Sequence, residues 1–519
     1  MSAADNLQSA RELAKGLAAG RLGSRDLLEQ HLSRIKERNA AVNAVVALDI
    51  EQARIRADEA DAAIRRGECW GPLHGLPMTI KDTWEVPGMP CTAGAPEYAN
   101  HRPQQPAPVV QRLQQAGAII FGKTNVPYKA LDIQTDNPVY GLSRNPWAPE
   151  LTTGGSSGGA AAALACGFTP LEVGSDIGGS IRIPAHFCGV YGHKTTHGMI
   201  SLRGHIPPEP GHIGEPDLGV AGPMARSADD LAFLLDIITV PPPGTQPGWR
   251  LDLPPPTHDR LADFRVLMWT DDDDCPIDSR LASAYGDLAA QLSQAGAKVS
   301  WGAPANLGLM DLYPNYTLQM GALMKAWLTR GERMAKGMVA PAMGWTPALL
   351  RTLARFMSSP KCIDKFVEGM TMSHSRWLNV LEDSLVLRER FTAAFEQYDV
   401  ILAPPTMTTA FPHDASLFAT RKLMVEGRSR HYSDLFMWIA PATVLGLPAT
   451  SAPVARTPEG LPVNVQIIGA PYEDRMTIQF ARLLSEMRGE VLAPMAVFAA
   501  LLALAREADP ALAIAAARQ

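Results

Sequence analysis

The chain has 519 residues, more than one average domain needs. Its formal net charge is −6 with both signs mixed, which argues against a nucleic-acid partner, because nucleic acid selects a basic face. Six cysteines without a Cys-x-x-Cys pair predict reduced thiols, not a disulfide framework or a zinc site. The N-terminus is polar and lacks the apolar stretch of a signal peptide, and no run reaches the roughly 20 apolar residues of a membrane span. We therefore expect no signal peptide, no membrane span and a cytoplasmic location.

The predicted elements begin with helices. Leu28, Leu32 and Ile35 recur at helical spacing behind Ser24, a candidate cap, so residues 1–65 are expected to form a helical segment packed on the core. Beyond them, short apolar runs punctuated by glycine and proline alternate with helical stretches. This alternation predicts an α/β sheet covered by helices, in a domain spanning residues 66–490.

The second half of the chain contains a predicted helical insertion at about 305–385. Strand signals fade there, and the stretch holds nine of the 21 methionines. Strands are expected again near 400, 450 and 465, and the proline-rich residues 251–260 read as a connection. Residues 491–519 are predicted to form a helical extension. Its apolar part fits two roles, packing on the rest of its own chain or pairing two chains in a homodimer.

The stretch GGSSG at 154–158 stands directly before an alanine-rich helical run. It matches the G-x-S-x-G elbow of α/β-hydrolases, which needs a strand before it and a helix after it. Residues 143–153 hold two prolines and no apolar alternation, so the context disfavours the elbow. A second match, Ser358-x-x-Lys361, contains Pro360, which disfavours the helix that would align its ends, and we treat it as chance.

A second serine-rich stretch, GSDIGGSIRIP, begins at Gly174. Gly178 and Gly179 remove side chains directly before Ser180, which leaves backbone N–H groups free to converge on one point, as an oxyanion hole requires. The alternative is an ordinary glycine turn between two strands.

A serine hydroxyl needs a base to act as a nucleophile. The candidate histidines have no signal beyond their place in the sequence and are more typical of structural or exposed positions: His74, His186, His193 and His197. Lys81 ends an apolar, strand-like run, and burial there would lower its pKa. Bringing the pKa near 7 costs about 4–5 kcal/mol. The alternative is a solvated surface lysine.

Three motifs taken in order, LHGLPMTIKD, GGSSGG and GSDIGGSIRIPAHFCGVYG, resemble the amidase signature family. The resemblance extends over roughly residues 5–485 and implies that family's fold, a large mixed sheet covered by helices on both faces. It implies Ser180 as nucleophile, Ser156 as bridging serine after a cis peptide bond from Gly155, and Lys81 as base. It also implies four oxyanion N–H groups, those of Ile177, Gly178, Gly179 and Ser180.

The resemblance further implies hydrolysis of a small-molecule amide through an acyl-enzyme, with no metal or cofactor. Asp176 and Arg182 flank the nucleophile, and we expect them to brace its loop. Departures from the family pattern, such as Ser175 where Thr is frequent and Tyr128 where Glu is frequent, leave the substrate open. The Met-rich insertion favours an apolar or aryl amide. Two alternatives are a glutaminase subunit of a tRNA-dependent amidotransferase and a non-catalytic binding protein.

Overall fold

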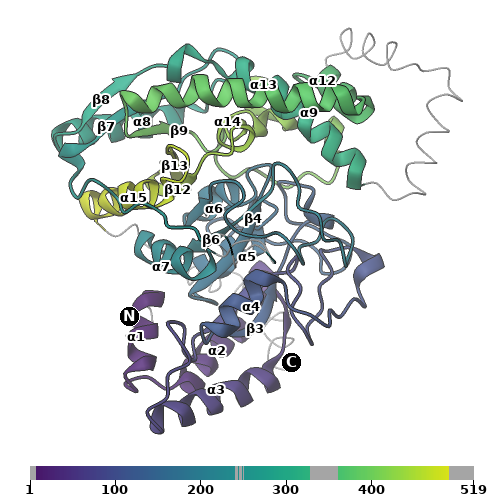
Figure 1. Cartoon of the computed structure of the whole chain (residues 1–519), viewed down its shortest axis with the longest axis vertical. Helices are drawn as coiled ribbons and strands as arrows, with labels where there is room; N and C mark the ends of the chain where they lie inside the picture. Colours follow the sequence, from purple (N-terminus) through teal and green to yellow (C-terminus); the bar gives the residue numbers. More distant parts are fainter. Residues whose placement is uncertain (1–6, 240–243, 245–247, 249, 328–359, 490–519) are drawn as a thin grey trace, which may run out of the picture.

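The computed structural model describes residues 7–239, 244, 248, 250–327 and 360–489 (Figure 1). A large mixed sheet flanked by helices forms the centre of this part of the chain, which confirms the predicted fold class. None of the helices within these ranges is long and apolar enough to cross a membrane. The predicted C-terminal extension lies outside the described residues.

The N-terminal segment contains helices α1 (Ala10–Ala18), α2 (Ser24–Val42) and α3 (Ile50–Arg65). The prediction of helices throughout was wrong for Val45–Leu48, which form strand β1 and pair with a later strand. Ser24 is also not the cap of α2. Gly23 occupies the cap position, and the Ser24 hydroxyl instead donates to the carbonyl of Gly75 at 2.6 Å.

A three-stranded sheet follows, in the order β1-β3-β2. Its strand β2 (Pro77–Lys81) is buried along its whole length and runs parallel to β3 (Ile119–Thr124), which is preceded by helix α4 (Pro108–Gln115). Burial on both faces explains the continuous apolar reading of this stretch. Lys81 is the last residue of β2.

Eight strands of the described residues form the large sheet, in the order β4-β6-β5-β12-β13-β9-β7-β8. Strand β7 runs parallel to both neighbours, whereas the pairs from β4 to β9 are antiparallel. The strands are β4 (Leu171–Asp176), β5 (Tyr191–Lys194), β6 (Val220–Ala225), β7 (Arg265–Met268), β8 (Lys298–Trp301), β9 (Val400–Ala403), β12 (Ala449–Arg456) and β13 (Pro462–Ile468).

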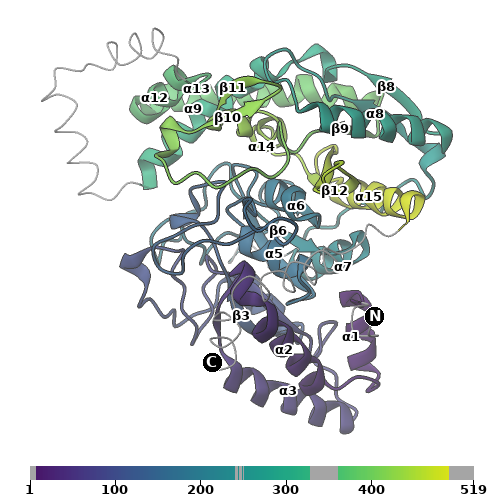
Figure 2. The same ribbon diagram turned by 180° about the vertical axis from the view of Figure 1, so that it is seen from behind.

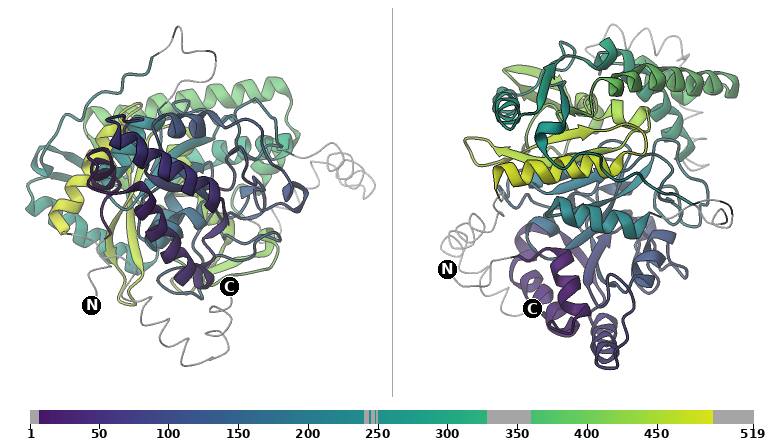
Figure 3. Two further views of the ribbon diagram at one scale, coloured as in Figure 1. Left: turned by 90° about the horizontal axis from the view of Figure 1, so that it is seen from below. Right: turned by 60° about the vertical axis from the view of Figure 1, so that its left-hand side comes forward.

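Helices pack against this sheet along its length. In Figure 3, α15 and α7 lie side by side on it. The helices in contact with its strands are α5 (Gly158–Ala165), α6 (Arg182–Cys188), α7 (Ala228–Ile238), α8 (Ser279–Gln294) and α15 (Asp474–Arg488).

A further helical layer lies at the opposite end of the molecule from α1, α2 and α3, as Figures 1 and 2 both show. It consists of α9 (Leu309–Trp327), α12 (Ile363–Thr371), α13 (His374–Thr392) and the short α14 (Ala440–Val444), with the hairpin β10 (Lys422–Val425) and β11 (Arg428–His431). The described parts of the predicted insertion are therefore helical. Residues 328–359 lie outside the described residues.

Candidate active site

The glycine-rich loop at 153–157 is buried and leads directly into α5. Its glycines sit against neighbouring backbone: a Cβ at Gly155 would lie 2.6 Å from the carbonyl oxygen of Asp132. The peptide bond between Gly155 and Ser156 is cis. In the described stretch before the loop, Leu151 and Thr152 form only isolated bridges, so the strand that an elbow needs is absent. The loop is a packed part of the core and not a linker.

Lys81 ends β2 inside the protein, with no solvent-exposed surface. Its Nζ lies 2.8 Å from the Oγ of Ser156 and 2.8 Å from the Oγ of Ser175. Burial lowers the pKa of Lys81 to about 7, although the carboxylates of Asp176 and Glu172 act in the opposite direction. A substantial share of Lys81 is therefore neutral near pH 7.

An ion pair holds the loop that leads from β4 into α6. The Asp176 carboxylate accepts from the Arg182 guanidinium at 2.7 Å and 3.1 Å, and both side chains are fully buried. Arg182 continues to the carbonyl of Ile439 at 2.9 Å and to Gln466 Oε1 at 2.6 Å. The expected bracing role of Asp176 and Arg182 is confirmed.

The Asp176 carboxylate also binds one of the predicted oxyanion donors, the N–H of Gly179, and this prediction is corrected. The Gly179 N–H donates to Asp176 Oδ1 at 3.0 Å, so this N–H is already engaged. Within the described residues, no hydrogen bond occupies the N–H of Gly178 or of Ser180. Gly179 serves the turn instead, because its φ is +81° and a Cβ there would lie 2.8 Å from Ile183 Cδ1.

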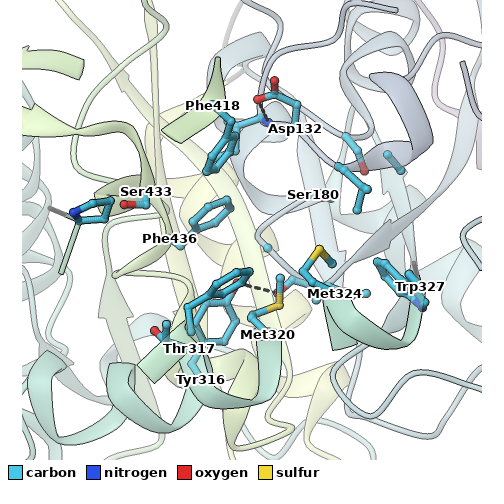
Figure 4. Close-up of a pocket in the computed structure, with 18 of the residues that line it drawn as sticks. Asp132, Ser180, Tyr316, Thr317, Met320, Met324, Trp327, Phe418, Ser433 and Phe436 are labelled. Atoms are coloured by element: carbon cyan, nitrogen blue, oxygen red, sulfur yellow. Dashed lines mark hydrogen bonds between the residues drawn. The ribbon is translucent and has the colours of Figure 1, made fainter. Parts of the chain in front are cut away.

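Ser180 faces a cavity of about 340 Å³ (Figure 4). Ser156, Ser175 and His205 also line it. The opposite wall is largely aromatic and apolar, formed by Tyr313, Tyr316, Met320, Met324, Trp327, Phe366, Phe418 and Phe436. Figure 4 shows Met320 and Met324 on the α9 side, across from Ser180.

The insertion contributes to this wall selectively. Of its described methionine and aromatic residues, six line the cavity: Tyr313, Tyr316, Met320, Met324, Trp327 and Phe366. The other four do not line it: Met310, Met370, Met372 and Trp377. Trp345, Phe356 and the remaining methionines lie outside the described residues, as does Ser358 of the Ser-x-x-Lys match.

Comparison with known proteins matches residues 26–478 to the amidase family model. The chain belongs to the amidase signature family. It is 30% identical to one of the subunits of the glutamyl-tRNA(Gln) amidotransferase from Cyanothece sp., over 92% of this chain and 97% of that protein. It is equally identical, 30%, to an indoleacetamide hydrolase from Bradyrhizobium diazoefficiens, over 93% and 87%. A crystal structure of an amidase superposes with a TM-score of 0.72 at 29% identity, covering 92% and 99%.

The four histidines considered from the sequence lie away from the cavity of this amidase-family chain. The ring of His186, for example, accepts the N–H of Asn464 at 2.9 Å and lies 3.2 Å from the carbonyl of Thr408. His193 lies 3.0 Å from Asp474. No group of three His, Cys, Asp or Glu in the described residues could hold a metal ion.

Sequence reasoning missed two polar residues of this amidase-like site. Ser175 stands within the second serine motif, on the fully buried strand β4, and its place in that motif next to Asp176 was the available signal. His205 lies in the irregular stretch between β5 and β6, where no periodicity indicates which side chains point inward. Its Nε2 lies 2.9 Å from Ser175 Oγ.

Proposed function

We propose that the chain is an amidase in which Ser180 is the nucleophile, Ser156 the bridging serine and Lys81 the base. The hydrogen bond between Lys81 and Ser156, with Ser180 on the wall of the same cavity, carries this proposal. A buried lysine with a pKa near 7 has the protonation state that a base needs near neutral pH.

The proposed reaction begins when neutral Lys81 takes the proton of Ser156, which takes that of Ser180. The Ser180 Oγ bonds to the amide carbon, and the N–H groups of Ile177, Gly178 and Ser180 receive the negative oxygen. As the tetrahedral species collapses, the C–N bond breaks and the proton returns through Ser156 to the leaving amine. Water then attacks the acyl-enzyme by the same relay and frees the acid.

The cavity wall supports an apolar or aryl substrate. Its described charged side chains are already paired: Asp132 accepts from Arg421 at 2.6 Å and from the hydroxyl of Tyr432 at 2.8 Å. Lys361 lies 2.6 Å from Asp274. The described wall thus offers aromatic rings and methionine side chains, which adapt to varied apolar shapes, and no unpaired charge for the polar end of glutamine.

Covalent labelling tests the nucleophile. We expect a fluorophosphonate to label the wild type, and Ser180→Ala to abolish the label. Ser157→Ala is the matched control, because its buried hydroxyl has no hydrogen-bond partner within the described residues and its loss should leave labelling intact. Mass spectrometry identifies the modified peptide. Label on Ser156 or Ser157 would refute the assignment, and no label at all would favour a binding protein.

A substrate series tests the cavity. Each added methylene should stabilise the bound transition state by about 1 kcal/mol and so raise kcat/KM several-fold, until the acyl group fills the cavity. Aryl amides should exceed acetamide. Met320→Ala provides the control, since widening the wall should move the optimum to longer chains without moving Ser180. A flat response across chain lengths would remove the wall from substrate selection.

A second candidate is the glutaminase subunit of a tRNA-dependent amidotransferase. The 30% identity to an amidotransferase subunit over nearly both whole chains supports it as much as the equal identity to the indoleacetamide hydrolase supports the first candidate. Glutamine hydrolysis, assayed with and without purified partner proteins, separates the two. Turnover of glutamine above every apolar amide would favour the glutaminase.

A further inference from the structure

His205 and Ser175 extend the hydrogen-bond network of Lys81. Nδ1 of His205 lies 3.1 Å from the carbonyl oxygen of Pro207, and its Nε2 lies 2.9 Å from Ser175 Oγ. The ring packs edge-on against the buried Trp84, with centroids 4.8 Å apart, so its position is fixed on both sides.

These contacts define where the hydrogens lie. A carbonyl oxygen only accepts, so Nδ1 of His205 carries a hydrogen and donates to Pro207. In a neutral ring Nε2 is then an acceptor, and it takes the single proton of the Ser175 hydroxyl. Desolvation lowers the pKa of His205 to about 3, and the charge of Lys81 is the second cause. The ring is therefore neutral.

The consequence reaches Lys81. A neutral amine has two N–H groups and one lone pair, and its hydrogen-bond partners in the described residues are Ser156 and Ser175. If Ser175 gave its proton to Lys81, the lone pair would be occupied and the base blocked. Because His205 holds that proton, Ser175 can only accept from Lys81.

We propose that His205 is a positioning residue, which keeps the lone pair of Lys81 available to Ser156 by holding the proton of Ser175. This inference rests on the proposed role of Lys81 as base. His205 touches no reacting atom in this scheme. It acts through the Ser175 hydroxyl, which determines whether Lys81 donates or accepts in its hydrogen bond to Ser175.

Two variants of equal chain length separate hydrogen bonding from packing. His205→Gln retains an acceptor for Ser175, whereas His205→Met fills similar space without one. We expect His205→Met to lower kcat about 10- to 100-fold with little change in KM, and His205→Gln to stay within about threefold of the wild type. Equal losses in both variants would overturn the proposal, and so would equal retention.

The pH profile offers a readout that a packing defect would not move. In His205→Met, the Ser175 hydroxyl is free to donate to neutral Lys81, which favours the neutral amine. The acidic limb of kcat/KM should therefore move to lower pH by about 0.5–1 unit, while the plateau falls. The titratable groups that face this network are the same in both variants: Asp176 and Glu172 toward Lys81, and Lys123 toward His205. Burial raises the pKa of Glu172 to about 8, and because both variants keep this group, a limb that moves in His205→Met alone reports on His205.

A double-variant cycle tests whether His205 acts through Ser175. In a Ser175→Ala background there is no proton to hold, so His205→Met should add less than about a twofold further loss. Additive losses would overturn the proposal. If His205→Met does not fold, as judged by thermal unfolding, His205→Asn replaces it, because the shorter amide does not reach Ser175.

Fluorophosphonate labelling distinguishes failure of this inference from failure of the proposed function. If Ser180 of the wild type is not labelled, the proposed function fails. If it is labelled with a pH limb that is the same in His205→Gln and His205→Met, only the role of His205 fails. The labelling rate is measured from pH 5 to 9 on the full chain, so no substrate needs to be known.

Discussion

Replacing Lys81 with methionine should abolish hydrolysis and, near neutral pH, stabilise the fold. The folded state lowers the pKa of Lys81 from 10.5 to about 7. At 1.36 kcal/mol per unit, the buried lysine costs the folded state about 4–5 kcal/mol at pH 7. Methionine removes this cost but also loses the hydrogen bonds to Ser156 and Ser175, about 1 kcal/mol each. The net gain at pH 7 is about 3 kcal/mol.

The dependence on pH gives the sign of the effect. Between pH 7 and 10.5 the unfolded chain keeps a proton on Lys81 that the folded chain has released, so wild-type stability rises with pH in that window. Below pH 7 both states are protonated, and this contribution stays at its lowest value. The advantage of Lys81→Met should therefore shrink by about 3 kcal/mol between pH 7 and 9.5, to near zero.

Urea unfolding of both proteins across this range measures the difference. Groups remote from Lys81 cancel, whereas Glu172, whose pKa burial raises to about 8 and the charge of Lys81 lowers, is replaced by glutamine in both proteins. Lys36→Met is the control, because this lysine is exposed and methionine there removes no buried ammonium group. A constant difference for Lys81→Met would refute the lowered pKa.

In parallel, wild-type kcat/KM should fall about tenfold between the plateau and pH 6. Lys81→Ala should also impair amides more than matched esters, since an amine leaving group needs the returned proton.

Two other sites give sharp predictions. Arg182→Met leaves the Asp176 carboxylate buried without its partner and should cost about 3–5 kcal/mol of unfolding free energy. Arg260→Met breaks an exposed pair and should leave the unfolding free energy nearly unchanged, so similar losses in both variants would contradict the bracing role. Gly179→Ala should abolish labelling of Ser180, because it combines φ of +81° with a contact of 2.8 Å. Gly211 has the same φ of +81°, but no atom lies within 4 Å of the Cβ that alanine would add. Gly211→Ala should therefore cost about 1 kcal/mol of unfolding free energy and leave labelling unchanged. Loss of labelling in this variant would indicate general unfolding.

The sequence alone determined the local features of this protein. The alternation of helical stretches and short apolar runs predicted a sheet covered by helices. Gly178 and Gly179 before Ser180 predicted a turn with free N–H groups, and the apolar run before Lys81 predicted a strand. These features depend on neighbours in the chain, so the order of residues is enough to predict them. The cap of α2 was wrongly assigned to Ser24 and the short strand β1 was missed, because tertiary contacts decide both.

Only the tertiary structure decided how the site is assembled. Lys81 reaches Ser156 across 75 positions of sequence, and Arg182 reaches Gln466 across 284. The engaged N–H of Gly179 depends on where a carboxylate ends in space. His205 carries no sequence signal, because its stretch is irregular and its partner Ser175 lies 30 positions away on β4. The cavity wall from α9, like these contacts, arises when distant elements pack together, and chain order does not encode that placement locally.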